Sequence, residues 1–350
     1  MAVKKPEDEK GLYSATPYDD AFRTMEGECD DLLLPLVNYF FDETYDEGAK
    51  ITRLRNEHFD EKTDGSEKRK ITDSHFSIMQ GGVTKYYHME CESSGFDESY
   101  LIKMFEYTSL IAKDEAEHDK AALHVRFPYT GLLLLAGGRD VPESAEVIIT
   151  TPKGEMSYDI VIINRKDIGL DEIFEKRLYF LIPFYIFNYK DNLNHIDDDP
   201  DQQEELTEKY KEIYNRMDVA LKERKLSLFS FGVIIESMRR VSYNMTLGHE
   251  KVHKKVGDMM GGQIMDLEWI KAWRAAEAEG VKKGEKKGRE EGREEGREEC
   301  RKEDIDIFIT DKRDDGVPEE KIREKLKKYY NLEDAEIDVY LNGEKKAETV

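Results

Sequence analysis

The stretch Ile71-Thr-Asp-Ser-His-Phe-Ser-Ile-Met-Gln-Gly-Gly-Val-Thr-Lys-Tyr-Tyr-His-Met-Glu-Cys-Glu92 decides the fold of this chain. Two segments of alternating polar and apolar residues flank a pair of glycines, which predicts a β-hairpin. Because successive strand residues point to opposite faces, the second strand places His88, Glu90 and Glu92 on one face. Cys91 and its apolar neighbours then point the other way, toward a core.

The acidic residues of this hairpin predict a metal site. Asp73 lies on the first strand, opposite Glu90 and Glu92 of the second. Neighbouring carboxylates repel one another unless a cation lies between them. Oxygen ligands alone suit Mg²⁺ or Mn²⁺, which bind phosphodiester substrates readily. The hairpin therefore predicts a metal-dependent nuclease; the alternative is that these polar residues simply face solvent.

Motifs in the same order along the chain resemble a known family. They are Asp20-Ala-Phe-Arg23, Asp73 with Glu90-Cys-Glu92, Lys103-Met-Phe-Glu-Tyr107, the strand end Gly137-Gly138, Met260-Gly-Gly-Gln-Ile-Met265 and a Gly-Arg-Glu-Glu tail. Together they resemble the recombination-promoting nuclease / putative transposase family of bacteria, within the PD-(D/E)XK nuclease superfamily. The resemblance implies an α/β fold with a restriction-endonuclease-like mixed sheet flanked by helices. It also implies Mg²⁺- or Mn²⁺-dependent cleavage of DNA, linked to recombination or mobile elements.

The resemblance also assigns roles to residues. Asp73 and Glu90 would ligate the metal, helped by the backbone carbonyl of Cys91. Glu92 would position or deprotonate the attacking water. At Glu92 the superfamily has lysine and this family usually has glutamine, so the cation that stabilises the transition state must come from elsewhere.

Lys85 on the hairpin and Lys103 on the next helix are candidates for that cation. Lys103 and Tyr107 lie four residues apart and share a helix face. Two interpretations fit this pair: contact with the scissile phosphate, or a lysine stem lying over a core tyrosine. His88 is either a contact to water or phosphate or a buried partner of Glu90. The alternative function is a catalytically degenerate nuclease fold that binds DNA or associates with itself.

A rival motif is His249-Glu-Lys-Val-His253, which has the spacing of the zinc-protease helix. Its third ligand is undefined, since Glu268 follows a Gly-Gly break. Val252 and Val256 share a helical stripe with the histidines. An amphipathic helix with partly buried histidines is therefore the preferred interpretation, and a zinc protease is a remote alternative.

Composition sets further limits. Among 350 residues, 39% are hydrophobic and 37% charged, which is typical of a globular protein with solvated helices. The net charge of −23 predicts that encounter with DNA depends strongly on salt and metal. Three scattered cysteines and an N-terminus unlike a signal peptide predict the cytoplasm. The apolar run 178–187 is shorter than the about 20 residues that span a bilayer, so a buried helix or strand is expected.

Changes of pattern divide the chain. We expect a flexible tail over residues 1–15, the nuclease-like domain over 16–198 and a helical extension over 199–278. Residues 279–303 repeat Gly-x-x-x between paired charges, which predicts a solvated helical linker, with a coiled coil or nucleic-acid binding as alternatives. Residues 304–350 predict a small helical segment, and this C-terminal region is where homo-oligomer formation is expected.

Overall fold

The computed structural model describes residues 16–61, 67–138, 140–260, 305, 308–310, 312–313, 317–330 and 332–343. These residues fall into two compact units, one up to residue 260 and one from residue 305 onward. The expected tail over 1–15 and the Gly-x-x-x segment over 279–303 lie outside the described residues, as does most of the Met260–Met265 motif.

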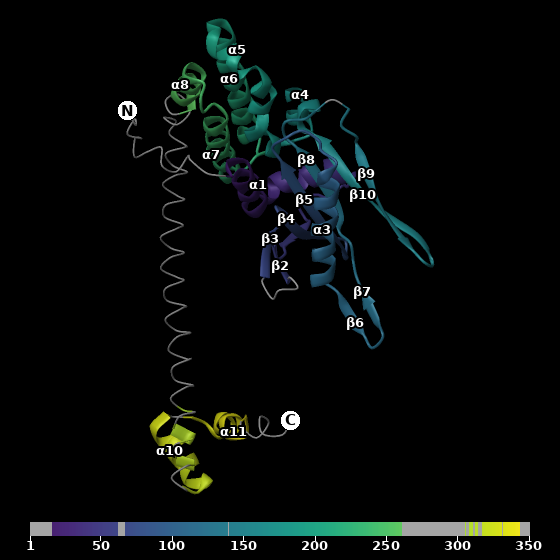
Figure 1. Ribbon diagram of the computed structural model, residues 1–350. Helices are drawn as coiled ribbons and strands as arrows, with labels where there is room; N and C mark the ends of the chain where they lie inside the picture. The colour runs from purple at the N-terminus through teal and green to yellow at the C-terminus, as the bar shows by residue number, and fades with distance from the viewer. Residues whose placement is uncertain are drawn as a thin grey trace. The chain divides into compact units, whose positions relative to one another are not determined.

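A six-stranded mixed sheet forms the centre of the first unit, with the strand order β1-β4-β5-β8-β10-β9 (Figure 1). The strands are β1 (Lys50–Arg53), β4 (Ser74–Gln80), β5 (Val83–Glu92), β8 (Tyr129–Leu134), β9 (Ser144–Thr151) and β10 (Gly154–Asn164). Strands β1, β4 and β5 are antiparallel neighbours, whereas β5, β8 and β10 run parallel. Parallel neighbours need a crossover, and α3 (Ser99–Asp114) lies in the one between β5 and β8. The predicted α/β class with a mixed sheet flanked by helices is confirmed.

The hairpin predicted from the sequence is β4–β5. Its register pairs Gln80 with Val83, and the turn residues Gly81 and Gly82 have φ values of 60° and 80°, which glycine adopts without strain. The alternating residues before this hairpin form two strands rather than one. After β1 the chain leaves the sheet, and β2 (Glu57–Glu61) pairs with β3 (Glu67–Ile71) in a separate ribbon. A second ribbon joins β6 (Glu117–Asp119) to β7 (Ala122–His124).

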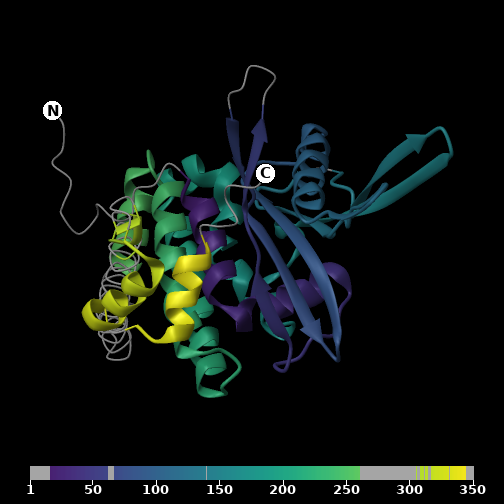
Figure 2. The same ribbon diagram turned by 90° about the horizontal axis from the view of Figure 1, so that it is seen from below.

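The two faces of the sheet carry different helices. On one face Met104 of α3 packs against Leu132, Leu134, Ile160 and Ile162, which alternate along β8 and β10. The other face joins the large core, which is built mainly from the helical half of the unit. The helical segments of this half are α1 (Pro17–Glu28), α2 (Asp30–Phe41), α4 (Leu170–Glu175), α5 (Leu193–Asp198), α6 (Pro200–Lys222), α7 (Leu228–Met245), α8 (Glu250–Asp258) and the 3₁₀ segments η2 (Arg165–Asp167) and η3 (Tyr179–Asn192). Figure 2 shows the β9–β10 hairpin projecting from this body.

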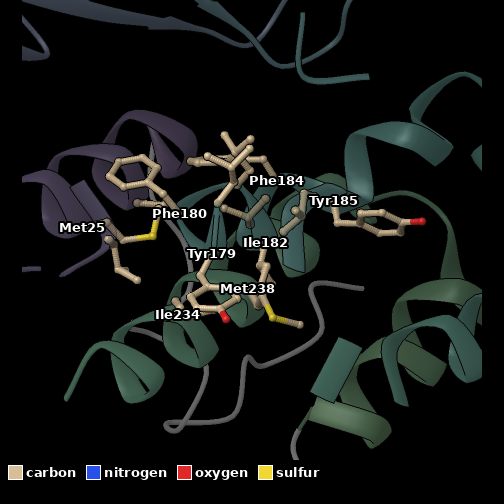
Figure 3. Packing of buried hydrophobic residues seen from close by; sticks show 14 of the residues in the cluster. Met25, Tyr179, Phe180, Ile182, Phe184, Tyr185, Ile234 and Met238 are labelled. Carbon is tan, nitrogen blue, oxygen red and sulfur yellow. The ribbon is translucent and has the colours of Figure 1, made fainter. Parts of the chain in front are cut away.

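The apolar run expected to be buried is the first part of η3. All residues from Tyr179 to Phe187 are buried, and Figure 3 shows this segment between Met25 of α1 and Ile234 and Met238 of α7. In the part of the chain that the structure describes, no helix has both the length and the apolar character needed to cross a membrane.

The boundary expected after residue 198 is not a break in the core. Leu206, Tyr210 and Met217 of α6 belong to the same buried cluster as Phe76 and Tyr87 of the sheet. Tyr210 also forms a hydrogen bond between helices α6 and α7, with 2.8 Å between its hydroxyl oxygen and Ser242 Oγ. The apolar stripe of α6 is therefore buried against its own chain, so the helices after residue 198 share the large core with one face of the sheet.

The second unit is a small helical cluster containing α10 (Glu319–Tyr330) and α11 (Asp334–Gly343). Ile322 and Leu326 of α10 are buried with Ile337 and Leu341 of α11. These two α10 side chains therefore fill the interior of their own unit.

Arg53 of β1 ties the sheet edge to the first two helices. Its Nε donates to the backbone carbonyl of Glu26, 3.1 Å away, and its guanidinium also pairs with Asp30. The Glu26 side chain is buried, and its Oε1 lies 3.7 Å from Arg53 Nε, too far for a hydrogen bond. Burial therefore raises the pKa of Glu26 to about 7, although Arg53 opposes the shift.

Glu26→Gln is expected to stabilise the protein by about 2 kcal/mol at pH 8 and to have little effect at pH 4. The pKa of Glu26 in the folded state lies above its ordinary value of 4.5, so between these two values the folded state holds a proton that the unfolded state has lost. The parent protein therefore loses stability as the pH rises from about 4.5 to about 7. Urea unfolding at pH 4, 6 and 8 measures the difference. Glu28→Gln removes the same charge at an exposed position of α1 and is the control. A stabilisation that does not change with pH would contradict the prediction.

Candidate functional site

The predicted carboxylates meet where the β4–β5 hairpin approaches α1 and α3. Asp73 immediately precedes β4, and its backbone N–H donates to Glu90 Oε1 at 2.9 Å. In return, the Cys91 N–H donates to Asp73 Oδ2 at 3.0 Å. Asp73 is only 4% exposed and Glu90 1%, so the solvent-facing alternative is wrong for both. Glu92 lies nearer the surface, with 19% of its side chain exposed.

The face assignment of β5 is confirmed. Tyr87, Met89 and Cys91 belong to the large core, and His88 and Glu90 point to the other side of the sheet. That side is buried as well, because α3 packs over it.

Lys103 of α3 supplies a cation to this cluster. Its Nζ lies 2.8 Å from Glu90 Oε2 and 2.7 Å from Glu92 Oε1. Burial acts to lower the pKa of Lys103, but the charges of Glu90 and Glu92 and the close contacts with their carboxylates raise it overall. The same Nζ lies 5.2 Å from the centre of the Tyr107 ring, so the lysine and the tyrosine share a helix face as predicted. Lys85 lies near the start of β5 and does not reach the cluster. Its Nζ pairs instead with Glu43, which follows α2.

Arg23 of α1 brings a second cation. Its Nη2 and Nε lie 2.7 and 3.2 Å from Asp73 Oδ1. Asp19, one turn earlier on α1, also lies near the cluster: burial raises its pKa, the charge of Arg23 opposes the shift and that of Glu92 adds to it. The contact of Arg23 joins residues 50 positions apart, so no local periodicity predicts it. Only the Asp20–Arg23 motif of the resemblance pointed to this residue.

The pKa values of the two buried carboxylates, Asp73 and Glu90, are shifted in opposite directions. Burial and the charge of Glu90 raise the pKa of Asp73, against the Cys91 amide and Arg23. Burial would raise the pKa of Glu90 too, but His88 and Lys103 hold it below its ordinary value. Divergent pKa values in adjacent acidic groups are typical of functional sites.

His88 fixes the orientation of Glu90. His88 Nε2 lies 3.0 Å from Glu90 Oε1, and its Nδ1 lies 3.3 Å from Thr108 Oγ1 of α3. The imidazole and the Asp73 amide thus both hold Oε1. Among the described residues Oε2 has no aligned hydrogen bond, and its contact with Lys103 is an ion pair. His88 is fully buried, so the structure shows it as a buried partner of Glu90.

The donor set fits a hard divalent cation of the Mg²⁺ type. Within the described ranges there is no group of three or more His, Cys, Asp or Glu side chains placed to hold one metal ion. Mg²⁺ does not require one, because it commonly takes one or two carboxylates and keeps several waters. Asp73 and Glu90 provide two carboxylates, and Glu90 Oε2 is a buried oxygen that lacks an aligned donor. The Cys91 carbonyl remains the third ligand that the resemblance implies.

The residues of the His-Glu-x-x-His motif lie at the start of an amphipathic helix, α8, that packs against its own chain. Helix α8 begins after His249, and His253 Nδ1 lies 2.9 Å from Thr246 Oγ1. Val252 and Val256 are buried on the same helix, as the amphipathic interpretation predicts. The third ligand considered from the sequence lies outside the described residues.

Comparisons of the chain with models of protein families, with curated proteins and with solved structures find no match.

Lys103→Met is expected to destabilise the protein by about 2–3 kcal/mol, because it leaves Glu90 buried without its cation. In the double variant Lys103→Met/Glu90→Gln the loss should shrink by about 1 kcal/mol or more, since a neutral amide needs no counter-charge. Urea unfolding at pH 7 measures both. The control is Lys176→Met, which breaks an exposed pair with Glu172 and should cost about 0.5 kcal/mol or less. Additive losses in the double variant would contradict the coupling.

Proposed function

We propose that this chain is a metal-dependent endodeoxyribonuclease that hydrolyses phosphodiester bonds at the cluster of Asp73, Glu90 and Glu92. One observation carries the proposal. The Asp73 backbone N–H bonds to Glu90, and Lys103 of the following helix lies within 3 Å of both Glu90 and Glu92. Carboxylates can hold a metal ion that activates water, and a nearby cation can stabilise the charge that develops on a phosphate, so these groups suit metal-assisted phosphodiester hydrolysis.

Each residue has a role in this proposal. Asp73 and Glu90, with the Cys91 carbonyl, would hold Mg²⁺ or Mn²⁺. Such an ion lowers the pKa of a bound water and polarises the phosphate. Glu92 is the most exposed of the three carboxylates and would orient the attacking water or take its proton. Lys103 would stabilise the negative charge that develops on the phosphate, in place of the lysine that the superfamily has at position 92.

The environment of the cluster supports this proposal despite the net charge of −23. Arg23 and Lys103 both lie within 3 Å of a cluster carboxylate. Two fixed cations and a bound metal would make the site itself attractive to a phosphate. A role in recombination or mobile elements, the cytoplasm and association between chains through the C-terminal region stay predictions.

Asp73→Ala and Glu90→Ala are each expected to slow Mg²⁺-dependent nicking of supercoiled plasmid by about 100-fold or more, since each removes a metal ligand. EDTA should abolish the activity and Mn²⁺ should restore it. Asp73→Asn and Glu90→Gln preserve side-chain shape, and circular dichroism establishes that they fold. The matched control Glu208→Ala removes a surface carboxylate on α6 and should cleave like the parent. A double Ala variant that nicks at the parent rate would refute the assignment.

A second candidate function is a degenerate nuclease fold that binds DNA without cleaving it. The specific observation in its favour is that Asp73, Glu90 and Glu92 each already have a cationic side chain within 3 Å. Such internal pairing stabilises the cluster without a metal.

Substitutions of Glu92 separate the two functions. If Glu92 orients or deprotonates the water, Glu92→Gln should lower the nicking rate by about 10-fold or more while leaving metal affinity nearly unchanged. If the site is degenerate, Glu92→Lys or Glu92→Gln should instead raise the rate, because it restores the residue usual in the superfamily or family. Plasmid nicking and calorimetric Mg²⁺ titration of the same preparations measure both effects.

A further inference from the structure

The carboxylate cluster lies at the start of a longer edge of the sheet. Strands β5, β8 and β10 are parallel and in register, with Glu92 paired to Leu134 and Leu134 paired to Asn164. Their carboxyl ends therefore lie side by side, beginning at Glu92 of the proposed site. In sheets with parallel strands, ligands bind outside the carboxyl ends.

The loops that leave this edge approach one another closely. A Cβ on Gly95 would lie 2.5 Å from the Gly137 carbonyl oxygen. Gly137 has a φ of 70°, and a Cβ on it would lie 2.6 Å from Asn164 Oδ1. Only glycine fits at these two positions. The connection from β5 is thus fixed against the connection from β8, with no side chain between them.

Two lysines are held at the same edge. Lys190 of η3 is exposed, and its Nζ donates to the backbone carbonyl of Ser93, the residue after Glu92, at 3.1 Å. Lys166 lies in η2, just after β10, and its Nζ lies 2.8 Å from Asp191 Oδ2. The partner of Lys190 is uncharged, and 77% of the Asp191 side chain is exposed to water. Both ammonium groups therefore lie near the exposed carboxylate of Asp191, which pairs with Lys166 and interacts electrostatically with Lys190.

We propose that Lys190 and Lys166 bind backbone phosphates of the nucleic-acid strand on the side of the scissile bond next to Glu92. The proposal rests on the nuclease function and adds a path for the substrate along the ends of β5, β8 and β10. An ammonium group binds phosphate as a point charge and supplies affinity without sequence preference. The pairing of Lys190 with a carbonyl leaves its other N–H donors for a phosphate.

Substituting Asp191 should change nucleic-acid affinity in the opposite direction to substituting the lysines. The Asp191 carboxylate competes with a phosphate for Lys166 and repels the strand. Removing its charge should therefore strengthen nucleic-acid binding, whereas removing either lysine should weaken it.

The experiment compares the full-length chain with Lys166→Gln/Lys190→Gln and with Asp191→Asn. The matched control is Lys211→Gln, which breaks an ion pair of 2.7 Å on α6. Fluorescence anisotropy with a short labelled DNA duplex, in EDTA and again in Ca²⁺, gives Kd at several salt concentrations. Plasmid nicking in Mg²⁺ gives kcat and KM.

For the double lysine variant we expect Kd to rise by about 10-fold or more and the slope of log K against log salt to fall by about 1.5 to 2. Asp191→Asn should lower Kd, and Lys211→Gln should leave Kd and slope unchanged. In nicking, KM should rise with kcat nearly constant, since the lysines bind phosphates away from the reacting bond.

The outcomes separate this proposal from the nuclease function. If the parent cleaves and the double lysine variant matches Lys211→Gln in Kd, slope and KM, the phosphate path is wrong and the nuclease stands. If the parent binds without cleaving and the lysine and Asp191 variants shift Kd in opposite directions, the path stands and the nuclease fails. A parent that neither binds nor cleaves DNA overturns both.

Discussion

Two hydrogen bonds across one hairpin, from the Asp73 amide to Glu90 and from the Cys91 amide to Asp73, set the main constraint on this structure. They hold two carboxylates almost entirely out of water. A buried carboxylate is tolerated only when cations or aligned donors compensate for its lost hydration. The rest of the site follows from that need, because Arg23 must come from α1 and Lys103 from α3 to supply the charge.

The same constraint links the helices to the chemistry. Met104, next to Lys103, packs into the small core over β8 and β10, and Thr108, one turn later, contacts His88. Docking of α3 therefore fixes both the cation and the imidazole that orients Glu90. On the other face of the sheet, Phe22 of α1 is buried in the large core. It immediately precedes Arg23 in the sequence, so its packing positions the arginine. Each cation of the cluster thus comes from a helix whose position is set by apolar packing rather than by the cluster itself.

Local patterns were sufficient to predict much of this. Alternation and a Gly-Gly turn gave the β4–β5 hairpin, the faces of β5 and the grouping of Asp73 with Glu90, because these depend on residues close in sequence. A four-residue spacing placed Lys103 and Tyr107 together. The sequence could not reveal which lysine reaches the cluster, since Lys85 and Lys103 are the same residue type and only the docking of α3 distinguishes them.

Other features depended on contacts that no short pattern encodes. The expected boundary after residue 198 followed a change from strands to helices. That change says nothing about whether the helices share the core of the sheet. The contact of Arg23 with Asp73 joins two elements that become neighbours only when the chain folds. Likewise, the His-Glu-x-x-His spacing satisfies a motif, but a motif has meaning only with its surroundings, and His253 is bonded to a threonine.

The glutamate at position 92 has a physical explanation in this arrangement. A lysine there would put three cations, with Lys103 and Arg23, beside the two carboxylates Asp73 and Glu90. With Glu92 in that place, Lys103 bridges two carboxylates, and the negative charge left on the cluster is one that a divalent cation can offset. If the nuclease proposal is correct, the cation of the site has moved from the strand to the helix, and the strand position has become free to act on water. The departure from the superfamily pattern then preserves the charge that the site needs and changes only the element that supplies it.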